Sequence, residues 1–218
     1  MKFTSNLSYL IGLITTDGNL SKDGRHIIFV SKDLDQINNV KKILKLKCEV
    51  KEKLGSYSNT KKYYYLQFSD VVLYRFLISI GLMPNKTKNL KSLNIPDEFF
   101  CDFLRGHLDG DGCTYYLWDK RWKSSFRLYT VFISASLKHL EWIQTKIIKL
   151  LKVTGRLRYY GRSVYHLIFA KKESVVLLNR LYYNKKVICL SRKQFKIDQA
   201  LGIINKQAGV EKLVYSLP

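Results

Sequence analysis

The 218-residue sequence, 46% of it hydrophobic, is long enough to bury a substantial core as one large domain or two small ones, so disorder is not expected. Its 38 lysines and arginines outnumber the 17 aspartates and glutamates, and the resulting formal charge of +21 indicates a polyanionic partner, of which nucleic acid is the commonest. No apolar run approaches the roughly 18 residues of a membrane span and no basic amphipathic helix dominates the sequence, so we expect a soluble intracellular protein, cytoplasmic or organellar, without a membrane partner.

The first half of the chain predicts helices that alternate with hairpins. A helix is predicted through YLIGLITTDG (9–18), and a hairpin follows it, with a turn at 22–24 and the strand FVS at 29–31. The spacing of Leu34, Ile37, Val40 and Leu44 predicts the second helix. A second hairpin then turns at 55–59 and continues through YLQF at 65–68. The last helix is predicted over 71–80, before the basic cluster 86–88.

The second half of the chain repeats this order. FLRGHLDGDG at 103–112 aligns without gaps with 9–18 at an offset of 94, and FIS at 132–134 aligns with FVS at an offset of 103. A helix over 137–147, a turn at 160–163, HLIF at 166–169, a helix over 175–182 and the basic cluster 191–193 complete the repeat. We therefore predict an α+β fold of two pseudo-symmetric half-domains, 1–94 and 95–202, with a C-terminal tail over 203–218.

Glycines inside the two repeated helices indicate that these helices pack against each other. A glycine within a helix costs roughly 1 kcal/mol relative to alanine, so Gly12 and Gly106, at the same place in both copies, indicate a close approach of the two backbones. The Asp-Gly ends of the helices then lie side by side. We expect Gly18 and Gly112 to turn the chain there with a positive φ.

This packing makes Asp17 and Asp111 neighbours at the axis between the halves. Two close carboxylates repel unless a cation or a proton lies between them. Divalent ions bridged by carboxylates are a known arrangement for phosphodiester hydrolysis. The four cysteines and four histidines form no cluster with the spacing of a zinc or redox site, so we expect oxygen ligands, which favour Mg²⁺.

The segments LIGLITTDG and LRGHLDGDG resemble the two LAGLIDADG motifs of single-chain homing endonucleases. The resemblance to this family covers roughly residues 7–200. The resemblance implies that the motif helices form the interface between the half-domains. It also implies that each half carries a four-stranded antiparallel, saddle-like sheet that binds the DNA major groove. The last acidic residue of each motif binds metal in this family, which carries over to Asp17 and Asp111 as the catalytic and metal-binding residues.

The resemblance also implies the rest of the metal site. The carbonyl oxygens of Thr16 and Gly110 are expected as additional ligands of Mg²⁺, with two or three ions at the pseudo-twofold axis, for which Mn²⁺ or Ca²⁺ could substitute in binding. Asp109 is the earlier acidic position of the second motif and has Thr15 as its counterpart, so we expect a structural role for it.

The family places polar or basic side chains around the metals, near the end of the strand that precedes the first helix after each motif. Lys32 is the best catalytic candidate by this criterion, and its counterpart is Ala135. Gln36 and His139, which align with each other one turn into the following helices, are further catalytic candidates. His107 aligns with Leu13 and is expected to be a partly buried helix residue.

The DNA-binding residues are expected on the strands, where alternation places every second side chain on one face. Long cations suit phosphates and guanine edges alike, and about half of the following candidates are expected to contact DNA: Lys22, Arg25, Lys51, Lys53, Lys61, Lys62, Tyr63, Tyr65, Trp118, Lys120, Arg121, Lys123, Arg127, Arg156, Arg158, Tyr160 and Arg162. The basic clusters add the expected backbone contacts Lys86, Lys88, Arg192 and Lys193.

The function that these observations predict is that of an intron-encoded homing endonuclease, or meganuclease: a monomer that cuts both strands of a long nonpalindromic DNA site with Mg²⁺. Two alternatives share the same fold. One is an intron maturase that binds host intron RNA, and the other is a noncatalytic DNA-binding regulator. Retention of both aspartates favours the nuclease.

Overall fold

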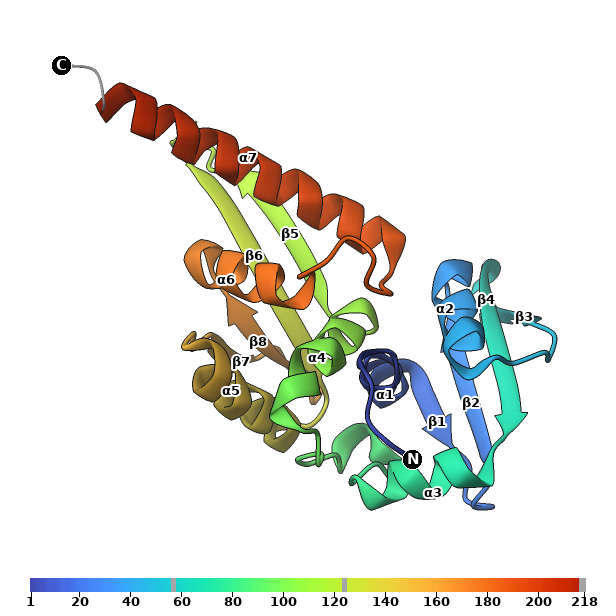
Figure 1. The fold of residues 1–218 in the computed structure, drawn as a ribbon. Helices are drawn as coiled ribbons and strands as arrows, with labels where there is room; N and C mark the ends of the chain where they lie inside the picture. The colour runs from blue at the N-terminus through green and yellow to red at the C-terminus, as the bar shows by residue number, and fades with distance from the viewer. Residues whose placement is uncertain (56–57, 123–124, 216–218) are drawn as a thin grey trace.

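The computed structural model describes residues 1–55, 58–122 and 125–215. The chain forms two half-domains, each with one antiparallel sheet, and the helices α1 and α4 lie between them (Figure 1). The segment after α3 connects the halves along one side of the molecule. No helix in the described part of the chain is both long enough and apolar enough to cross a lipid bilayer.

The N-terminal half has the predicted alternation of helices and hairpins. Its elements are α1 (Ser5–Asp17), β1 (Gly18–Leu20), β2 (His26–Ser31), α2 (Leu34–Leu44), β3 (Lys51–Gly55), β4 (Ser58–Ser69) and α3 (Val71–Ser79). Polar caps fix where two of these helices begin: the Thr4 hydroxyl accepts the amide N–H of Leu7 at 3.2 Å, and the Asp70 carboxylate accepts that of Leu73 at 2.9 Å.

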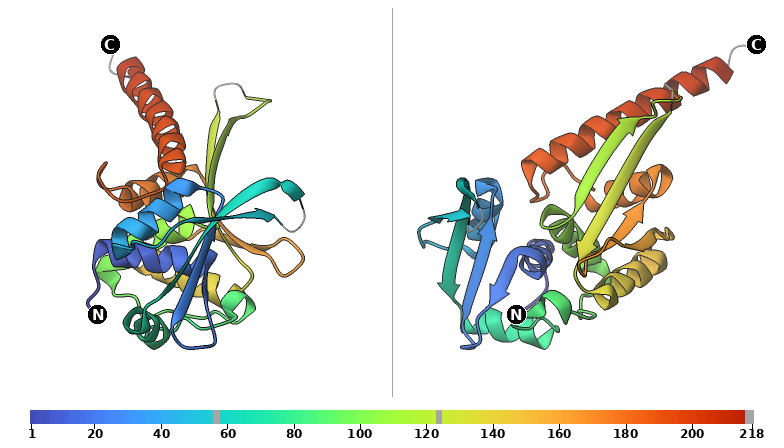
Figure 2. Two further views of the ribbon diagram at one scale, coloured as in Figure 1. Left: turned by 90° about the vertical axis from the view of Figure 1, so that its right-hand side faces the viewer. Right: turned by 180° about the vertical axis from the view of Figure 1, so that it is seen from behind.

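The C-terminal half repeats this order and extends it. After the short 3-10 turns η1 (Lys86–Lys88) and η2 (Asp97–Phe99), its elements are α4 (Phe100–Asp109), β5 (Cys113–Trp118), β6 (Phe126–Ser134), α5 (Leu137–Leu151), β7 (Arg156–Tyr159), β8 (Tyr165–Phe169), α6 (Lys171–Leu181) and α7 (Ser191–Tyr215). Figure 2 shows α7 running along the β5–β6 hairpin and beyond it. The tail predicted for 203–218 is therefore helical as far as Tyr215, because α7 continues without a break through Gly202.

The two sheets have equivalent strand orders, β1-β2-β4-β3 and β5-β6-β8-β7, and all their pairings are antiparallel. Alternation along β2 buries Ile27 and Phe29 against the helices and turns Ile28 and Val30 to the other face. The predicted α+β fold, with a four-stranded antiparallel sheet in each half, is confirmed.

The interface between the halves is the contact of α1 with α4, as the paired glycines predict. A Cβ atom added to Gly12 would lie 2.7 Å from the amide nitrogen of His107, and one added to Gly106 would lie 2.9 Å from the carbonyl carbon of Tyr9. Real Cβ atoms do not approach backbone so closely, so only glycine fits at either position. The side chains on all sides of α1 are buried, from Leu7 to Thr15.

Gly106→Ala is expected to lower the free energy of unfolding by about 3 kcal/mol, because the added methyl group overlaps backbone atoms that cannot rotate away. The matched control is Gly202→Ala in α7, where an added Cβ meets nothing within 4 Å. Alanine is expected there to be neutral or to stabilise the protein by up to about 1 kcal/mol. Chemical denaturation measures both changes, and equal stabilities for the two variants would contradict the close approach of the helices.

The glycines that end the motifs have a different role from the one predicted. Gly18 has φ −88°, and Gly112 is not among the residues with positive φ, so neither uses the left-handed conformation. An added Cβ would instead lie 2.7 Å from Cα of Ile14 at Gly18, and 2.7 Å from Cα of Leu108 at Gly112. The prediction of positive φ was wrong, because these glycines are required where the first strand folds back closely against the last turn of its own motif helix.

Candidate active site

The ends of the two motif helices bring Asp17 and Asp111 together. Asp17 is the last residue of α1, whereas α4 ends at Asp109 and Gly110 follows it as the C-cap, so Asp111 lies just beyond the helix. A Cβ atom on Gly110 would lie 2.7 Å from Oδ2 of Asp17. The Asp17 carboxylate therefore packs directly on the backbone of the residue that precedes Asp111.

Both carboxyl groups are shifted toward their neutral forms. Burial, followed by the charge of Asp111, raises the pKa of Asp17 to about 7, against the opposing effect of the Thr16 hydroxyl, which donates to Oδ2 at 3.2 Å. Asp111 is more open to solvent, yet partial burial also raises its pKa, while Lys193 and Lys86 oppose the shift. Asp17 is therefore only partly ionised near neutral pH, and a cation between the two groups would stabilise the ionised pair.

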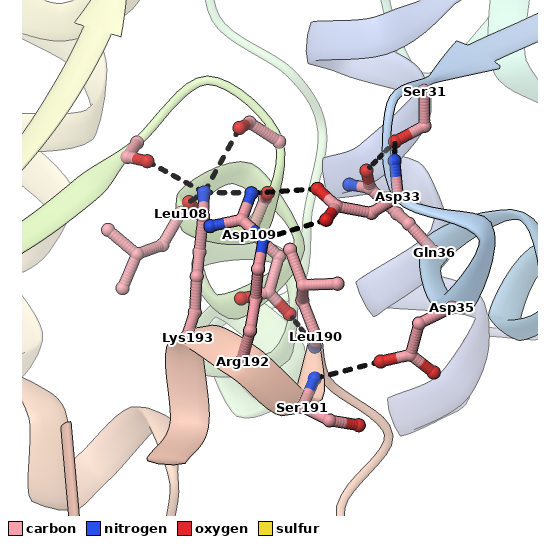
Figure 3. Close-up of polar contacts among 12 residues, drawn as sticks. Ser31, Asp33, Asp35, Gln36, Leu108, Asp109, Leu190, Ser191, Arg192 and Lys193 are labelled. Atoms are coloured by element: carbon pink, nitrogen blue, oxygen red, sulfur yellow. Dashed lines mark hydrogen bonds and ion pairs between the residues drawn. The ribbon is translucent and has the colours of Figure 1, made fainter. Parts of the chain in front are cut away.

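Two lysines hold the carboxyl ends of the motif helices. Lys86 of η1 is buried, and its ammonium donates to the carbonyl oxygen of Gly18. Lys193 of α7 donates to the carbonyl oxygens of Leu108, Asp109, Gly110 and Gly112, at 2.7, 2.7, 3.1 and 2.7 Å (Figure 3). Since Gly18 and Gly112 are equivalent in the repeat, Lys86 and Lys193 occupy equivalent places in the two halves.

These lysines are not available as the DNA backbone contacts that were predicted for them. Burial lowers the pKa of both, while nearby carboxylates oppose the shift: Asp17 and Asp111 for Lys86, and chiefly Asp109 for Lys193. A positive charge at the carboxyl end of a helix also stabilises the helix dipole. The signal for this role was present in the sequence, because each half closes on a basic cluster at the same place in the repeat.

Asp109 has the structural role that was expected of it. Its carboxylate is fully buried and accepts the hydroxyls of Tyr9 at 2.9 Å and Tyr182 at 3.1 Å, and the amide N–H of Leu190 at 2.7 Å. Burial raises its pKa to about 6. The residue therefore connects α1, α4 and the segment before α7, rather than facing the surface where Asp111 lies.

The donors available for a metal are the two carboxylates and nearby carbonyl oxygens. No group of three or more histidine, cysteine, aspartate or glutamate side chains that could hold a metal occurs among the described residues. The Gly110 carbonyl oxygen, a predicted ligand, accepts a hydrogen bond from Lys193, which leaves one of its two lone pairs for a cation. An all-oxygen set with few protein ligands suits Mg²⁺, which keeps several waters or phosphate oxygens in its shell.

Of the three predicted catalytic side chains, two are buried with other partners, and the role of Lys32 stays a prediction. Lys32 is exposed, and its ammonium lies 5.3 Å from the centre of the Tyr63 ring. Gln36 is buried and accepts the Ser31 hydroxyl at 2.5 Å. His139 is also buried, and its Nδ1 lies 2.8 Å from the carbonyl oxygen of Lys91. The prediction for Gln36 and His139 was wrong because the first turns of α2 and α5 direct these positions into the core.

On the N-terminal sheet, strand register separates the predicted DNA-binding residues onto two faces. Lys51 lies opposite Tyr65 and Lys53 opposite Tyr63, so these four side chains share the face that points away from the core. Lys62 points to the other face, where it forms an ion pair with Glu52 at 3.0 Å, which corrects its prediction. Lys22 and Arg25 are exposed near the β1–β2 turn, and the side chain of Lys61 lies outside the described residues.

On the C-terminal sheet, the corresponding face carries arginines and aromatic rings. A groove of about 920 Å³ is lined by Tyr115, Tyr129, Arg156, Arg158 and Tyr160, among others. Tyr115 and Tyr129 were missed by the sequence analysis, although their opposite positions in β5 and β6 give them the same face. They stack with ring centres 5.2 Å apart. This face is therefore suited to bind bases and phosphates together.

Three other candidates of the C-terminal half have partners in the protein. Trp118 does not share the outward face of Tyr115 and Tyr129, which corrects its prediction: it packs edge-to-face on Phe126 at 5.1 Å, and 46% of it is exposed. Arg127 shares the outward face but donates to the buried Asp119 carboxylate, and Arg121 lies 3.6 Å from the same group. Lys88, Lys120 and Arg162 are exposed and keep their prediction, whereas Lys123 lies outside the described residues.

Arg192 connects the two halves instead of extending toward a ligand. Its guanidinium donates to both carboxylate oxygens of Asp33, at 2.7 Å each, and the Ser191 amide N–H donates to Asp35 at 2.9 Å (Figure 3). Ser191 and Arg192, at the start of α7, therefore bind the start of α2. The next residue in the chain, Lys193, binds the end of α4. Arg192 is not free for the predicted DNA contact.

Comparison with solved structures identifies the fold of the chain. No protein-family model and no curated protein sequence matches the chain. The homing endonuclease I-WcaI bound to its DNA recognition sequence is 13% identical, with a TM-score of 0.64 over 90% of this chain and 87% of that chain. The LAGLIDADG meganuclease I-AabMI bound to uncleaved DNA is 17% identical, with a TM-score of 0.57 over 99% of both chains. The N-terminal LAGLIDADG domain of DUF199/WhiA is 17% identical, with a TM-score of 0.57 over 90% of this chain and 86% of that domain.

Proposed function

We propose that this chain, which has the LAGLIDADG fold, is a metal-dependent DNA endonuclease that cuts both strands of a long nonpalindromic duplex as a monomer. The observation that carries the proposal is the contact between the ends of α1 and α4, which places Asp17 against the residue before Asp111. Among the described residues, no lysine or arginine forms an ion pair with Asp17 or Asp111. Burial of both groups, and the charge of Asp111 near Asp17, nevertheless disfavour their ionised forms.

The residues present fit a divalent cation. The pKa of Asp17 is raised by burial and by the charge of Asp111, so a divalent cation between the two groups would favour their ionised forms, and the available donors are oxygens only. Asp17 and Asp111 would hold the ion, and the carbonyl oxygens of Thr16 and Gly110, which precede them in the chain, are the further ligands that we propose. A bound Mg²⁺ would activate water and stabilise the leaving oxygen of the phosphodiester.

The remaining residues of the site position this acidic pair and bind the substrate. Lys86 and Lys193 fix the two helix ends, so the carboxylates stay in register with each other. The outward faces of the two sheets carry Lys51 and Lys53 in one half and Arg156 and Arg158 in the other. The different composition of these faces implies that the two half-sites of the DNA target differ, because each sheet reads its own half.

The DNA-bound states of I-WcaI and I-AabMI support duplex DNA as the ligand. The WhiA domain shares the fold at 17% identity, so the fold alone does not separate the nuclease from a noncatalytic DNA-binding role, which is the second candidate. The two differ in what they require of Asp17 and Asp111. A binding protein has no use for a destabilised acidic pair facing the DNA phosphates, which such a pair repels.

The test is to incubate the purified protein with a genomic or randomised duplex library and Mg²⁺, and to sequence the cleaved ends. Ends that cluster at one long nonpalindromic sequence are expected, and the double variant Asp17→Asn/Asp111→Asn, prepared in the same way, should give none. Strong and salt-sensitive binding without any cleavage would overturn the endonuclease in favour of the regulator. Preferential binding of structured RNA over duplex DNA would instead favour the maturase.

Lys53→Gln is expected to weaken DNA binding and to reduce the slope of log affinity against log salt by about 1, because Lys53 lies on the outward face. Lys62→Gln is its matched control on the same hairpin, since Lys62 lies on the opposite face and pairs with Glu52. Titration of labelled duplex in Ca²⁺ at several salt concentrations measures both. The assignment of the DNA-binding face is wrong if Lys62→Gln has the larger effect.

A further inference from the structure

A small polar cavity lies next to one of the two carboxylates. It has a volume of about 50 Å³, and its polar lining includes Thr15, Thr16, Lys86, His107, Asp111 and Ser134. One ordered water occupies roughly 10 to 15 Å³ of such volume, so the cavity has room for a few waters. Carboxylate, ammonium, hydroxyl and imidazole groups together provide the several hydrogen-bond partners that an ordered water requires.

His107 is the one imidazole in this lining. The side chain is 1% exposed, and its Nδ1 atom has no hydrogen-bond partner among the described residues. Its ring stacks on His139 at 5.3 Å and packs edge-to-face against Phe132 at 5.8 Å. Burial, followed by the neighbouring His139, holds the pKa of His107 well below its usual range, so the ring is neutral at physiological pH.

The equivalent position in the other motif helix shows that a histidine is not needed for packing. Leu13 occupies it and is fully buried. Apolar side chains therefore suit this place in the helix, whereas a buried imidazole with an unpaired nitrogen costs stability. A lining residue that carries an unpaired buried polar atom is a candidate to bind water in the cavity.

The two halves also differ around the cavity. Ala135, the counterpart of Lys32, lines it, so no lysine enters it from the strand of the C-terminal half. His139, the counterpart of Gln36, stacks its ring on that of His107. The imidazole of His107 thus stands where the N-terminal half has the apolar side chain of Leu13.

We propose that His107 is a positioning residue that holds ordered water in this cavity beside Asp111, and that it supports hydrolysis of only one of the two DNA strands. The inference rests on the proposed endonuclease function and deepens it. Asp111 is the carboxylate that shares the cavity with His107, while Asp17 is not part of the lining. Because His107 lies beside only one of the two carboxylates, we expect the two DNA strands to be cut at different rates.

His107→Leu is the matched variant, because it installs the residue of the other motif. With each strand of the target labelled separately, we expect cleavage of one strand to slow by about 10- to 100-fold, as for other supporting groups around a metal site, and the other rate to stay within about twofold. Nicked duplex should accumulate. His107→Asn, which keeps a polar group in the cavity, should recover part of the rate.

Three measurements separate the possible outcomes. A thermal unfolding midpoint for His107→Leu at or above that of the wild type shows that a loss of rate is not a loss of fold. Equal slowing of both strands, or no slowing of either, would overturn the strand-specific role while leaving the endonuclease function intact. Absence of cleavage by the wild-type protein on any duplex would overturn the endonuclease function itself.

Nuclear magnetic resonance of the free protein tests the water contact without relying on activity. The ring protons of His107 are expected to show cross-relaxation with water, and the ring nitrogens are expected to keep the pattern of a neutral imidazole. Cross-relaxation with protein protons alone would overturn the inference, whatever the cleavage rates are.

Discussion

Asp17→Asn is expected to lower double-strand cleavage by at least about a thousandfold, below detection in an ordinary assay. The amide has nearly the same shape as the carboxylate but cannot supply the negative charge that holds a divalent cation. Asp111→Asn should have a similar effect, because the two carboxylates meet at one place. Each variant should still bind the target in Ca²⁺ with an affinity no more than a few-fold below that of the wild type. Its affinity should not fall further, because the substitution removes a negative charge that faces the phosphates.

The control for these variants is Asp198→Asn, an exposed carboxylate on α7 away from the helix ends. It should cleave at the wild-type rate. Linear and nicked products of a supercoiled plasmid that carries the target distinguish loss of both cuts from loss of one. Full double-strand cleavage by either motif variant would remove the basis for assigning the site.

Lys193→Met is expected to have the second largest effect, because it removes the group that binds the end of α4. Four carbonyl oxygens share its ammonium, and hydrogen bonds to a charged donor contribute about 1.5 to 3 kcal/mol each before compensation by water. Since the carbonyls can regain part of their hydration, we expect a net loss of about 3 kcal/mol in the free energy of unfolding. Cleavage should fall by about a hundredfold at a temperature where the variant remains folded.

Lys196→Met is the matched control on the same helix, because Lys196 is exposed. Denaturation with urea measures the stability of both variants, and strand cleavage at low temperature measures the effect on the site. Equal stabilities for the two variants would show that the hydrogen bonds of Lys193 do not support the end of α4.

The parts of the fold that the sequence predicts are those in which local patterns are repeated. Two in-register copies of an Asp-Gly ending are enough to predict that α1 and α4 are paired, and the interior glycines predict how closely they approach. The strand order follows because each half has the same succession of hairpins and helices. The neighbourhood of Asp17 and Asp111 was predicted for the same reason, since a symmetric pair of helix ends can meet only at the axis.

The errors concern features that depend on contacts distant in sequence. The basic cluster at the end of each half marks Lys193 as equivalent to Lys86, but it does not show that the ammonium contacts a helix end more than 80 residues earlier, so Lys193 was assigned to DNA. Gln36 and His139 were assigned to the site because they align, but alignment does not determine that their helix turns face inward. Trp118 was assigned from its residue type, whereas the register of β5 with β6 places it on the face opposite to that of Tyr115 and Tyr129, where it packs on Phe126.

The two carboxylates are equivalent in the repeat, but the residues around them differ. In the N-terminal half, Lys32 follows the strand and Leu13 occupies the helix; in the C-terminal half these are Ala135 and His107. Two cuts made by one site with unequal surroundings are expected to differ in rate, and the order of cutting should be fixed. A single-chain protein permits such divergence, because each half evolves its own side chains.

Anomalous X-ray diffraction from Mn²⁺ in crystals of the protein bound to its duplex target tests the central assignment most directly. The expected result is anomalous density within bonding distance of both the Asp17 and the Asp111 carboxylates, with a DNA phosphate as a further ligand, and its loss in the Asp17→Asn variant. Anomalous density elsewhere with none at this pair, in crystals that hold the DNA across both sheets, would contradict the assignment.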